Sequence, residues 1–232
     1  MIALLVVALA SFFLYRLLGG APTLRINRKN AAQQNITKIK ELSDYAHRLR
    51  VSNKFTGAEK VYLQILKIDH KHAATYSRLG TLYVAMKNLG DAVECFQIAA
   101  QLSPSGSTYY NLGLGYYENR NYLKAVAAFE KAIMFEPSVQ RHVGLAKTFE
   151  KIGDPAKMLS ALEQAVQLED NTKVLWMLGE AYASAGRPED AMKAFERLIA
   201  LDAKDTRAKK ALAEVKVQLS KPSSDLGKAG AA

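Results

Sequence analysis

Residues 76–108 read YSRLGTLYVAMKNLGDAVECFQIAAQLSPSGST, and residues 109–137 read YYNLGLGYYENRNYLKAVAAFEKAIMFEP. The second stretch repeats the first at an offset of 33 residues, with the same residue type at eight positions. The matched residues are Tyr76 and Tyr109, Leu79 and Leu112, Gly80 and Gly113, Tyr83 and Tyr116, Ala92 and Ala125, Phe96 and Phe129, Ala99 and Ala132, and Pro104 and Pro137. Self-similarity at such a period indicates an array of stacked structural units.

The spacing inside each copy predicts two α-helices joined by a short turn. Tyr76, Leu79 and Tyr83 lie at i, i+3 and i+7, which is one side of a helix. Ala92 and Phe96 begin the corresponding stripe of a second helix. The polar residues between the two stripes suit the turn of an antiparallel helical hairpin. Small residues recur where two helices come close, and aromatic residues fill the space beside them.

The repeated residues resemble the tetratricopeptide repeat, a pattern of about 34 residues that carries Leu-Gly, Tyr, Ala, Phe and Pro at fixed places. This resemblance implies an all-α fold, a right-handed α-solenoid of about five helix hairpins. Each hairpin of such an array buries its apolar face mainly against its neighbours. The resemblance also implies a mode of action, which is to hold a protein or peptide partner.

Weaker copies extend the pattern on both sides of the two strong ones. Terminal repeats commonly depart from the pattern, and a helix with one polar face is expected to cap the array. Small and polar residues after this helix predict a disordered tail. The expected segments are an array at 31–205, with repeats at about 39–72, 73–105, 106–138, 139–171 and 172–205, then a capping helix at 206–220 and the tail at 221–232.

The first eighteen residues, MIALLVVALASFFLYRLL, predict a transmembrane signal anchor at 1–18. A membrane-spanning helix needs about 20 apolar residues, with a lower limit of about 17, so this run suffices if Arg16 reaches toward the interface. A cleaved secretory signal peptide is the alternative, but it requires a positively charged start, which this sequence lacks. A peripheral or buried apolar helix is the third interpretation.

The positive charges follow the apolar run, and none precedes it. Because lysine and arginine remain on the cytoplasmic side, we expect a single-pass membrane protein whose array faces the cytoplasm, joined through a basic juxtamembrane linker at 19–30. The predicted function is a membrane-anchored scaffold or adaptor for complex assembly at the cytoplasmic membrane face. The alternative is an exported or periplasmic assembly factor for a pilus or an outer-membrane complex.

No motif in the sequence indicates catalysis, and we expect neither an enzyme nor a cofactor. The formal charge of +10 favours anionic partners, but acidic residues are interleaved with the cations, which argues against nucleic-acid binding. The stretch 69–72, Asp-His-Lys-His, lies in a predicted turn without further ligands nearby, so we expect no metal site. The single cysteine, Cys95, excludes an intramolecular disulfide. The sequence does not predict the oligomeric state.

The resemblance also suggests where a partner binds. In the family, binding side chains come from first-helix positions that lie off the packing stripe and face the concave groove. Carried onto this sequence, they predict a peptide-binding groove of Arg50, Arg78, Thr81, Tyr110, Asn111, Leu114, Tyr117, Lys147, Glu150, Trp176, Met177 and Glu180, with Ser43, His47, Ser77 and Val143 among them.

Two features of this predicted groove are specific to the sequence. Trp176 follows Leu175, which takes the packing position, so we expect the indole to point into the groove; the alternative is that it packs against the capping helix. The family members that bind chaperone C-termini use a clamp of lysine, asparagine and arginine. The corresponding residues here are Ser43, His47, Arg78, Ser107 and Asn111, so the clamp is absent.

Overall fold

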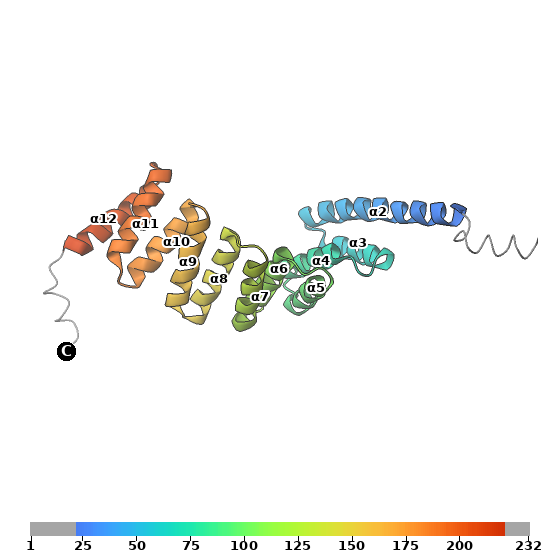
Figure 1. The fold of residues 1–232 in the computed structure, drawn as a ribbon, viewed down its shortest axis with the longest axis horizontal. Helices are drawn as coiled ribbons and strands as arrows, with labels where there is room; N and C mark the ends of the chain where they lie inside the picture. The colour runs from blue at the N-terminus through green and yellow to red at the C-terminus, as the bar shows by residue number, and fades with distance from the viewer. Residues whose placement is uncertain (1–21, 221–232) are drawn as a thin grey trace, which may run out of the picture. The chain divides into compact units, whose positions relative to one another are not determined.

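The structure, a computed structural model, describes residues 22–220, with side chains from Asn30 onward. Within this range the chain forms eleven α-helices and no strand, which confirms the all-α prediction (Figure 1). The helices are α2 (Pro22–Val51), α3 (Phe55–Ile68), α4 (Ala73–Ala85), α5 (Leu89–Leu102), α6 (Gly106–Glu118), α7 (Tyr122–Phe135), α8 (Val139–Ile152), α9 (Pro155–Leu168), α10 (Thr172–Ser184), α11 (Pro188–Leu201) and α12 (Thr206–Ser220). The chain divides into two compact units, Met1–Thr75 and Tyr76–Ala232.

The first unit contains α2 packed on α3. Helix α3 buries Ala58, Val61, Tyr62 and Ile65, and the side chain of Leu49 reaches Gly57 at its start. Helix α2 begins at Pro22, inside the stretch 19–30 that was predicted to be a linker, so residues 22–30 of that stretch are helical. A proline costs no hydrogen bond in the first turn of a helix, and residues 23–51 contain no further proline or glycine to interrupt it.

The predicted anchor at 1–18 and the predicted tail at 221–232 lie outside the described residues. Among the helices between residues 22 and 220, none combines the length and the apolar character needed to cross a membrane.

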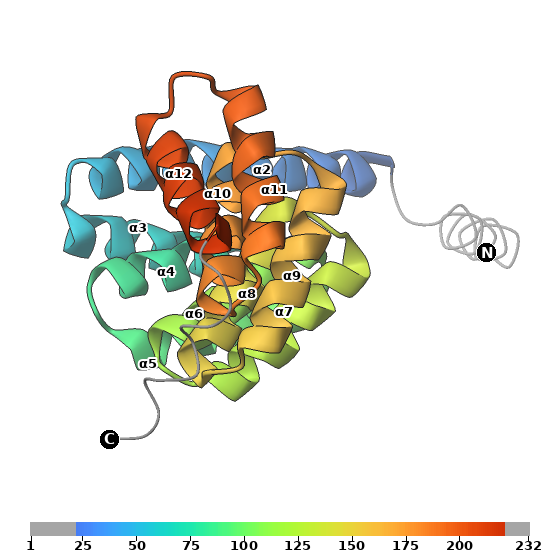
Figure 2. The ribbon, with the colours of Figure 1, turned by 90° about the vertical axis from the view of Figure 1, so that its left-hand side faces the viewer.

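The second unit stacks its helices in antiparallel pairs, and each helix from α5 to α12 contacts the next one along the chain (Figures 1 and 2). The first helices of the pairs begin at Gly106, Val139 and Thr172, where the period of 33 residues places them. In addition, α6 contacts α8. The first helices of two successive pairs therefore lie side by side.

The core of the second unit is built from phenylalanine rings set against glycines. A Cβ atom built on Gly80 would lie 2.6 Å from the ring of Phe96, and one on Gly115 would lie 2.7 Å from it. Gly80 precedes Phe96 in the same repeat, whereas Gly115 belongs to the next one. Each ring thus packs on the first helix of its own repeat and on the first helix of the repeat that follows, and only glycine leaves room for it.

Phe129 repeats this arrangement, which we call the Phe–Gly packing. Gly113 of its own repeat and Gly144 of the next would bring a Cβ to 2.7 Å and 2.9 Å from the Phe129 ring. The fourth repeat has Ala146 and Leu162 at the places of Gly113 and Phe129, and both are fully buried. Alanine is larger than the glycine it replaces, and leucine is smaller than the phenylalanine it replaces. The two changes together therefore conserve the packed volume.

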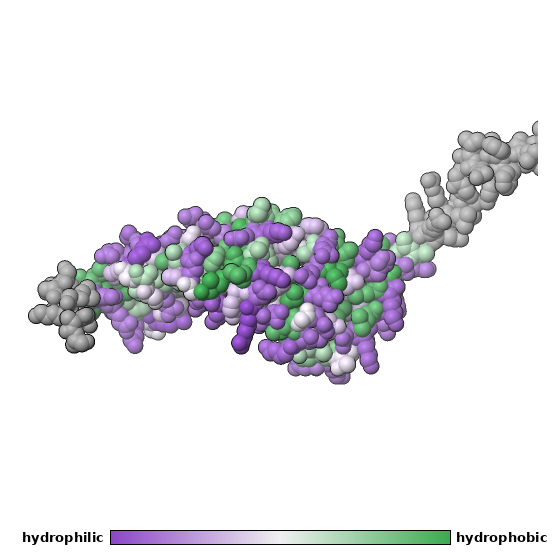
Figure 3. Space-filling view, turned by 90° about the horizontal axis from the view of Figure 1, so that it is seen from below, coloured by the Kyte–Doolittle hydropathy of each residue, from purple (hydrophilic) through white to green (hydrophobic). Residues whose placement is uncertain are grey.

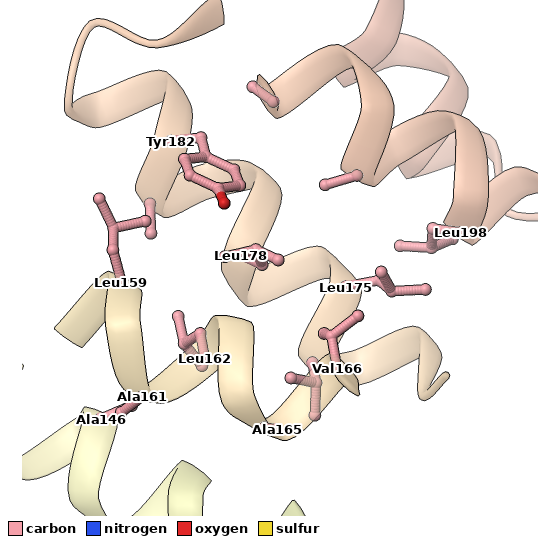
Figure 4. Close-up of a cluster of buried hydrophobic side chains, with 14 of the residues drawn as sticks. Ala146, Leu159, Ala161, Leu162, Ala165, Val166, Leu175, Leu178, Tyr182 and Leu198 are labelled. Atoms are coloured by element: carbon pink, nitrogen blue, oxygen red, sulfur yellow. The ribbon is translucent and has the colours of Figure 1, made fainter. Parts of the chain in front are cut away.

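Helix α9 connects the core of the fourth repeat to that of the fifth, because its leucines pack against α10. Figure 4 shows Leu159 and Leu162 of α9 pointing toward Leu178 and Tyr182 of α10. The Tyr182 hydroxyl donates a hydrogen bond to Glu163 at 2.6 Å, and the guanidinium of Arg187 lies 4.5 Å from the centre of the same ring. Burial and the nearby Glu163 carboxylate raise the pKa of Tyr182 to about 12, so its hydroxyl keeps its proton.

Replacing Gly113 with alanine tests the Phe–Gly packing. The new Cβ would lie 2.7 Å from the Phe129 ring, and Gly144 of the next repeat blocks the ring from moving away. We expect the free energy of unfolding to fall by about 1–3 kcal/mol, the usual cost of overpacking a core. Urea unfolding followed by circular dichroism measures this loss.

Two further variants make the test specific. Phe129→Leu, added to Gly113→Ala, should recover part of the loss, because the pair then copies Ala146 and Leu162. Gly90→Ala is the control: its Cβ would meet no atom within 4 Å, so it should be neutral or stabilise by up to about 1 kcal/mol. Equal stability of the Gly113 and Gly90 variants would contradict the proposed packing.

Candidate functional site

Apolar side chains from three consecutive first helices form a partly exposed strip in the second unit. They lie on α6, α8 and α10, are half-buried, and pack against the core. We call the following residues the first-helix strip: Tyr110, Leu114, Tyr117, Val143, Trp176 and Met177. The structure thus packs six of the predicted groove residues against one core cluster. A half-buried apolar side chain is fixed by the core yet still offers surface to a partner.

Polar residues from the same three helices accompany the strip. Asn111 is half-buried, while Lys147, Glu150 and Glu180 are exposed. Both signs of charge are present, so these residues can orient a partner segment but do not select one sign of net charge.

Two tyrosines of the strip are held by aromatic neighbours. The ring of Tyr110 lies 5.6 Å from that of Phe129, and the ring of Tyr117 lies 5.7 Å from that of Tyr122, edge to face. Burial raises the pKa of Tyr110 more than its hydrogen bond with Gln140 lowers it, and burial likewise raises the pKa of Tyr117. Both hydroxyls remain protonated at neutral pH and can donate a hydrogen bond to a peptide carbonyl.

Trp176 does not point freely out of α10. Its ring lies 5.4 Å from that of Phe195 on α11, and the guanidinium of Arg207 on α12 stacks 4.1 Å from its centre. The contact with Arg207 matches the alternative arrangement, packing against the last helix, while the indole stays half-buried at the end of the strip. A cation over the face of a tryptophan is favourable, so α12 covers the end of the strip.

The remaining predicted residues lie elsewhere. Arg78 and Thr81 are exposed on α4, where the Thr81 hydroxyl donates to the carbonyl of Ser77 at 3.0 Å. Arg50 belongs to the first unit and is half-buried near the end of α2. Ser43, also on α2, is only 8% exposed, which corrects its place among the accessible groove residues.

The side chains of Asp69 and His72, in the stretch 69–72, form local hydrogen bonds in the turn between α3 and α4. A side-chain oxygen of Asp69 accepts a hydrogen bond from the backbone N–H of Lys71 at 3.0 Å, and the ring of His72 pairs with the Thr75 hydroxyl at 2.8 Å. Across the described part of the chain, no group of three histidine, cysteine or acidic residues converges as a metal site would require. Burial, with Glu94 and Asp91 nearby, raises the pKa of Cys95 to about 11, which keeps its thiol protonated.

Two buried polar residues at the start of α8, Arg141 and His142, were not among the predicted groove residues. Arg141 is nearly buried; its guanidinium donates to the Glu136 carboxylate at 2.8 Å and to the Glu136 carbonyl, and lies against Gly106. It therefore fixes the turn that joins α7 to α8. His142 is only 5% exposed, and its Nδ1 atom has no hydrogen-bond partner. The sequence did carry a signal for His142: the equivalent positions of the neighbouring repeats are Tyr109 and Leu175, both of which belong to the packing stripe.

Three family models of the tetratricopeptide repeat match the chain, at residues 73–105, 106–139 and 151–215. Together they cover more than half of its length. No curated protein matches the chain in sequence.

Solved structures resemble this one at low sequence identity. A crystal structure of MamA is 23% identical, with a TM-score of 0.62 over 70% of this chain and 96% of its own. MamA from Desulfovibrio magneticus RS-1 is 16% identical, with a TM-score of 0.63 over 73% and 97%. YrrB, described as a TPR protein with an unusual peptide-binding site, is 18% identical, with a TM-score of 0.58 over 73% and 89%. At these identities the likeness shows the fold.

His142 generates a prediction about pH. Burial lowers its pKa in the folded chain, whereas the unfolded chain takes up a proton near the ordinary value of 6.5. The unfolded state therefore binds more protons as the pH falls through 6.5, and stability should decline there. His142→Leu, which copies Leu175 of the next repeat, should remove this part of the decline.

Thermal unfolding between about pH 7 and 5 measures the effect, since carboxylates with ordinary pKa values titrate lower. The matched control is His47→Leu, which also removes one histidine but at an exposed position. If the His142 variant kept the parent's pH dependence, the buried imidazole would not be its source.

Proposed function

Because the chain is a tetratricopeptide-repeat protein, we propose that it acts as a scaffold that holds a segment of a partner protein on the first-helix strip. The observation that carries this proposal is the strip itself: six half-buried apolar side chains from α6, α8 and α10, supported from below by the core. Apolar surface arranged in a row across consecutive repeats suits an extended or helical segment rather than a compact small molecule.

The physical basis is preorganisation. The strip is already formed in the unbound chain, so the ordering cost on binding falls mainly on the partner segment. Each Å² of apolar surface removed from water contributes about 25 cal/mol, which makes the rings of Tyr110 and Tyr117 the main anchors. Lys147, Glu150 and Glu180 would then set the register of the bound segment. The peptide-binding description of YrrB is consistent with this use of the fold.

We extend the proposal to the N-terminal residues. The apolar run at 1–18 is long enough to anchor the chain in a membrane, and the cations that follow it favour an array on the cytoplasmic face. The scaffold would then gather its partner at the bilayer for complex assembly. Export of the array to the other side, as in a periplasmic assembly factor, is the competing arrangement.

Crosslinking tests the binding face. A photo-crosslinking amino acid at Asn111, Lys147 or Glu180 should give the same adduct in cells, because all three accompany the strip. Placed at Gln167, an exposed position on the second helix α9, it should give none. Leu114→Lys combined with Met177→Lys puts charge into the strip and should reduce adducts at Lys147 to background.

Circular dichroism of the double variant shows whether the fold is kept, and Gln164→Lys with Gln167→Lys, at exposed positions of α9, controls for the two added positive charges. Undiminished adducts in a folded double variant, or adducts formed only from α9, would refute the assignment of this face.

Membrane extraction and a reporter test the anchor. The full chain should stay in the membrane pellet at alkaline pH, and a chain starting at Pro22 should be released. A reporter active only in the cytoplasm, fused to Ala232, should be active. A silent reporter on a full-length, membrane-bound fusion would favour the exported arrangement, and release of the full chain would exclude an integral anchor.

A further inference from the structure

A second candidate surface lies on the other side of the third repeat, between α6 and α7. A cleft of about 200 Å³ opens there. We call it the lysine–tyrosine cleft, after the residues that line it: Tyr109, Leu112, Tyr116, Lys124, Ala128 and Lys131. None of them belongs to the first-helix strip.

Both lysines of the cleft lie over aromatic rings and lack a carboxylate partner. The ammonium of Lys124 is 5.7 Å from the centre of the Tyr116 ring, and that of Lys131 is 5.4 Å from the centre of the Tyr109 ring. Neither forms an ion pair within the described part of the chain, although other exposed lysines do, such as Lys157 with Asp154 at 3.1 Å. Their charge remains available to a ligand.

No acidic side chain lines the cleft. Glu130, which neighbours Lys131 in sequence, lines a different cleft of about 370 Å³ together with Ile133 and Met134. The lysine–tyrosine cleft is thus cationic at its rim and apolar at its floor, where Leu112 and Ala128 are nearly buried.

The aromatic walls of the cleft are held in place. Gln97 of α5 donates a hydrogen bond to the Tyr116 hydroxyl at 2.7 Å. Phe135 stacks on Tyr109 with ring centres 5.5 Å apart and planes inclined by 24°, and it remains 54% exposed. Apolar side chains also reach the molecular surface in patches elsewhere (Figure 3), but here they are combined with two unpaired cations. The walls are therefore ready to receive an apolar side chain.

The spacing of the lysines defines the ligand further. They lie seven residues apart on α7, which corresponds to about 10 Å along a helix. In a peptide with the polyproline II conformation, which has three residues per turn, side chains three residues apart lie on the same side and about 9 Å from each other. Two carboxylates at that separation could each reach one lysine.

We propose that the lysine–tyrosine cleft binds a short acidic segment of a partner protein, with two carboxylates three residues apart and an apolar side chain between them. Charge complementarity, the apolar floor and the aromatic walls select this ligand. A nucleic acid is a poorer match, because a phosphate backbone is recognised by many cations and this cleft offers two. The proposal concerns a second face and does not rest on the function proposed for the first-helix strip.

A defined peptide tests the proposal on the full chain in detergent. The probe is a fluorescein-labelled peptide with aspartate, phenylalanine, glycine and glutamate in that order between neutral flanks. The control peptide has asparagine and glutamine in place of the two acids. Fluorescence anisotropy should show salt-sensitive, saturable binding of the acidic probe below about 1 mM and weaker binding of the neutral one.

Charge reversal locates the site. Lys124→Glu with Lys131→Glu should weaken probe binding by at least about tenfold, because both ion pairs turn into repulsions. Lys204→Glu with Lys209→Glu makes the same change in net charge outside the cleft and should leave binding unchanged. A carbodiimide, which joins carboxylates to amines, should couple the probe to Lys124 and Lys131, as peptide mass mapping can show.

Several results would overturn the proposal: no saturable binding below about 1 mM, equal binding of the neutral peptide, or equal losses in the two charge-reversal variants. A single-stranded oligonucleotide that competes with the probe at lower concentration would assign the cleft to nucleic acid instead. Leu114→Lys with Met177→Lys separates the two faces, because it should abolish groove adducts and leave probe binding intact. If this strip variant lost probe binding while the charge-reversal variant of the cleft kept it, the peptide would bind on the strip instead.

Discussion

The contact between one phenylalanine ring and two glycines determines how this array is built. Phe96 and Phe129 each fill the space left by a glycine of their own first helix and by a glycine of the next one. A single side chain therefore closes a hairpin and joins it to its neighbour, so that neither contact forms fully without the other. This is the local form of a general property of repeat proteins, whose stability is the sum of units and of interfaces between neighbours.

Much of this arrangement could be predicted from sequence, because the residues that make it recur at a fixed offset. The same-repeat glycines, Gly80 and Gly113, repeat together with Phe96 and Phe129 and so were visible as a pattern. The second glycine of each contact could not be recognised as a repeated residue, because Gly115 and Gly144 occupy different positions within α6 and α8. Which glycine a ring meets in the next repeat depends on the angle between hairpins, and a period does not encode that angle.

Other features depend on single residues rather than on the period. The turn inside each hairpin has a residue with positive φ at the same place, yet only Gly153 and Gly186 are glycines; Asn53, Lys87 and Arg120 adopt the conformation too. The recurring hairpin geometry overrides the local preference of these residues, which costs about 1–2 kcal/mol for a residue with a Cβ. Trp176 was likewise ambiguous, because Arg207, its partner, lies outside the repeated pattern.

The same packing explains why the two faces differ in chemistry. First helices α6 and α8 contact each other, and side chains beside their packing stripes remain half-buried against the same core cluster. Clefts lined by α7 open on the other side, and the large side chains at their edges stay exposed, with Met134 at 83%. A side chain of a first helix can thus be part of the strip or of a separate cleft, depending on which side of the helix carries it. Two partners of different chemistry could occupy the two faces without competing for the same atoms.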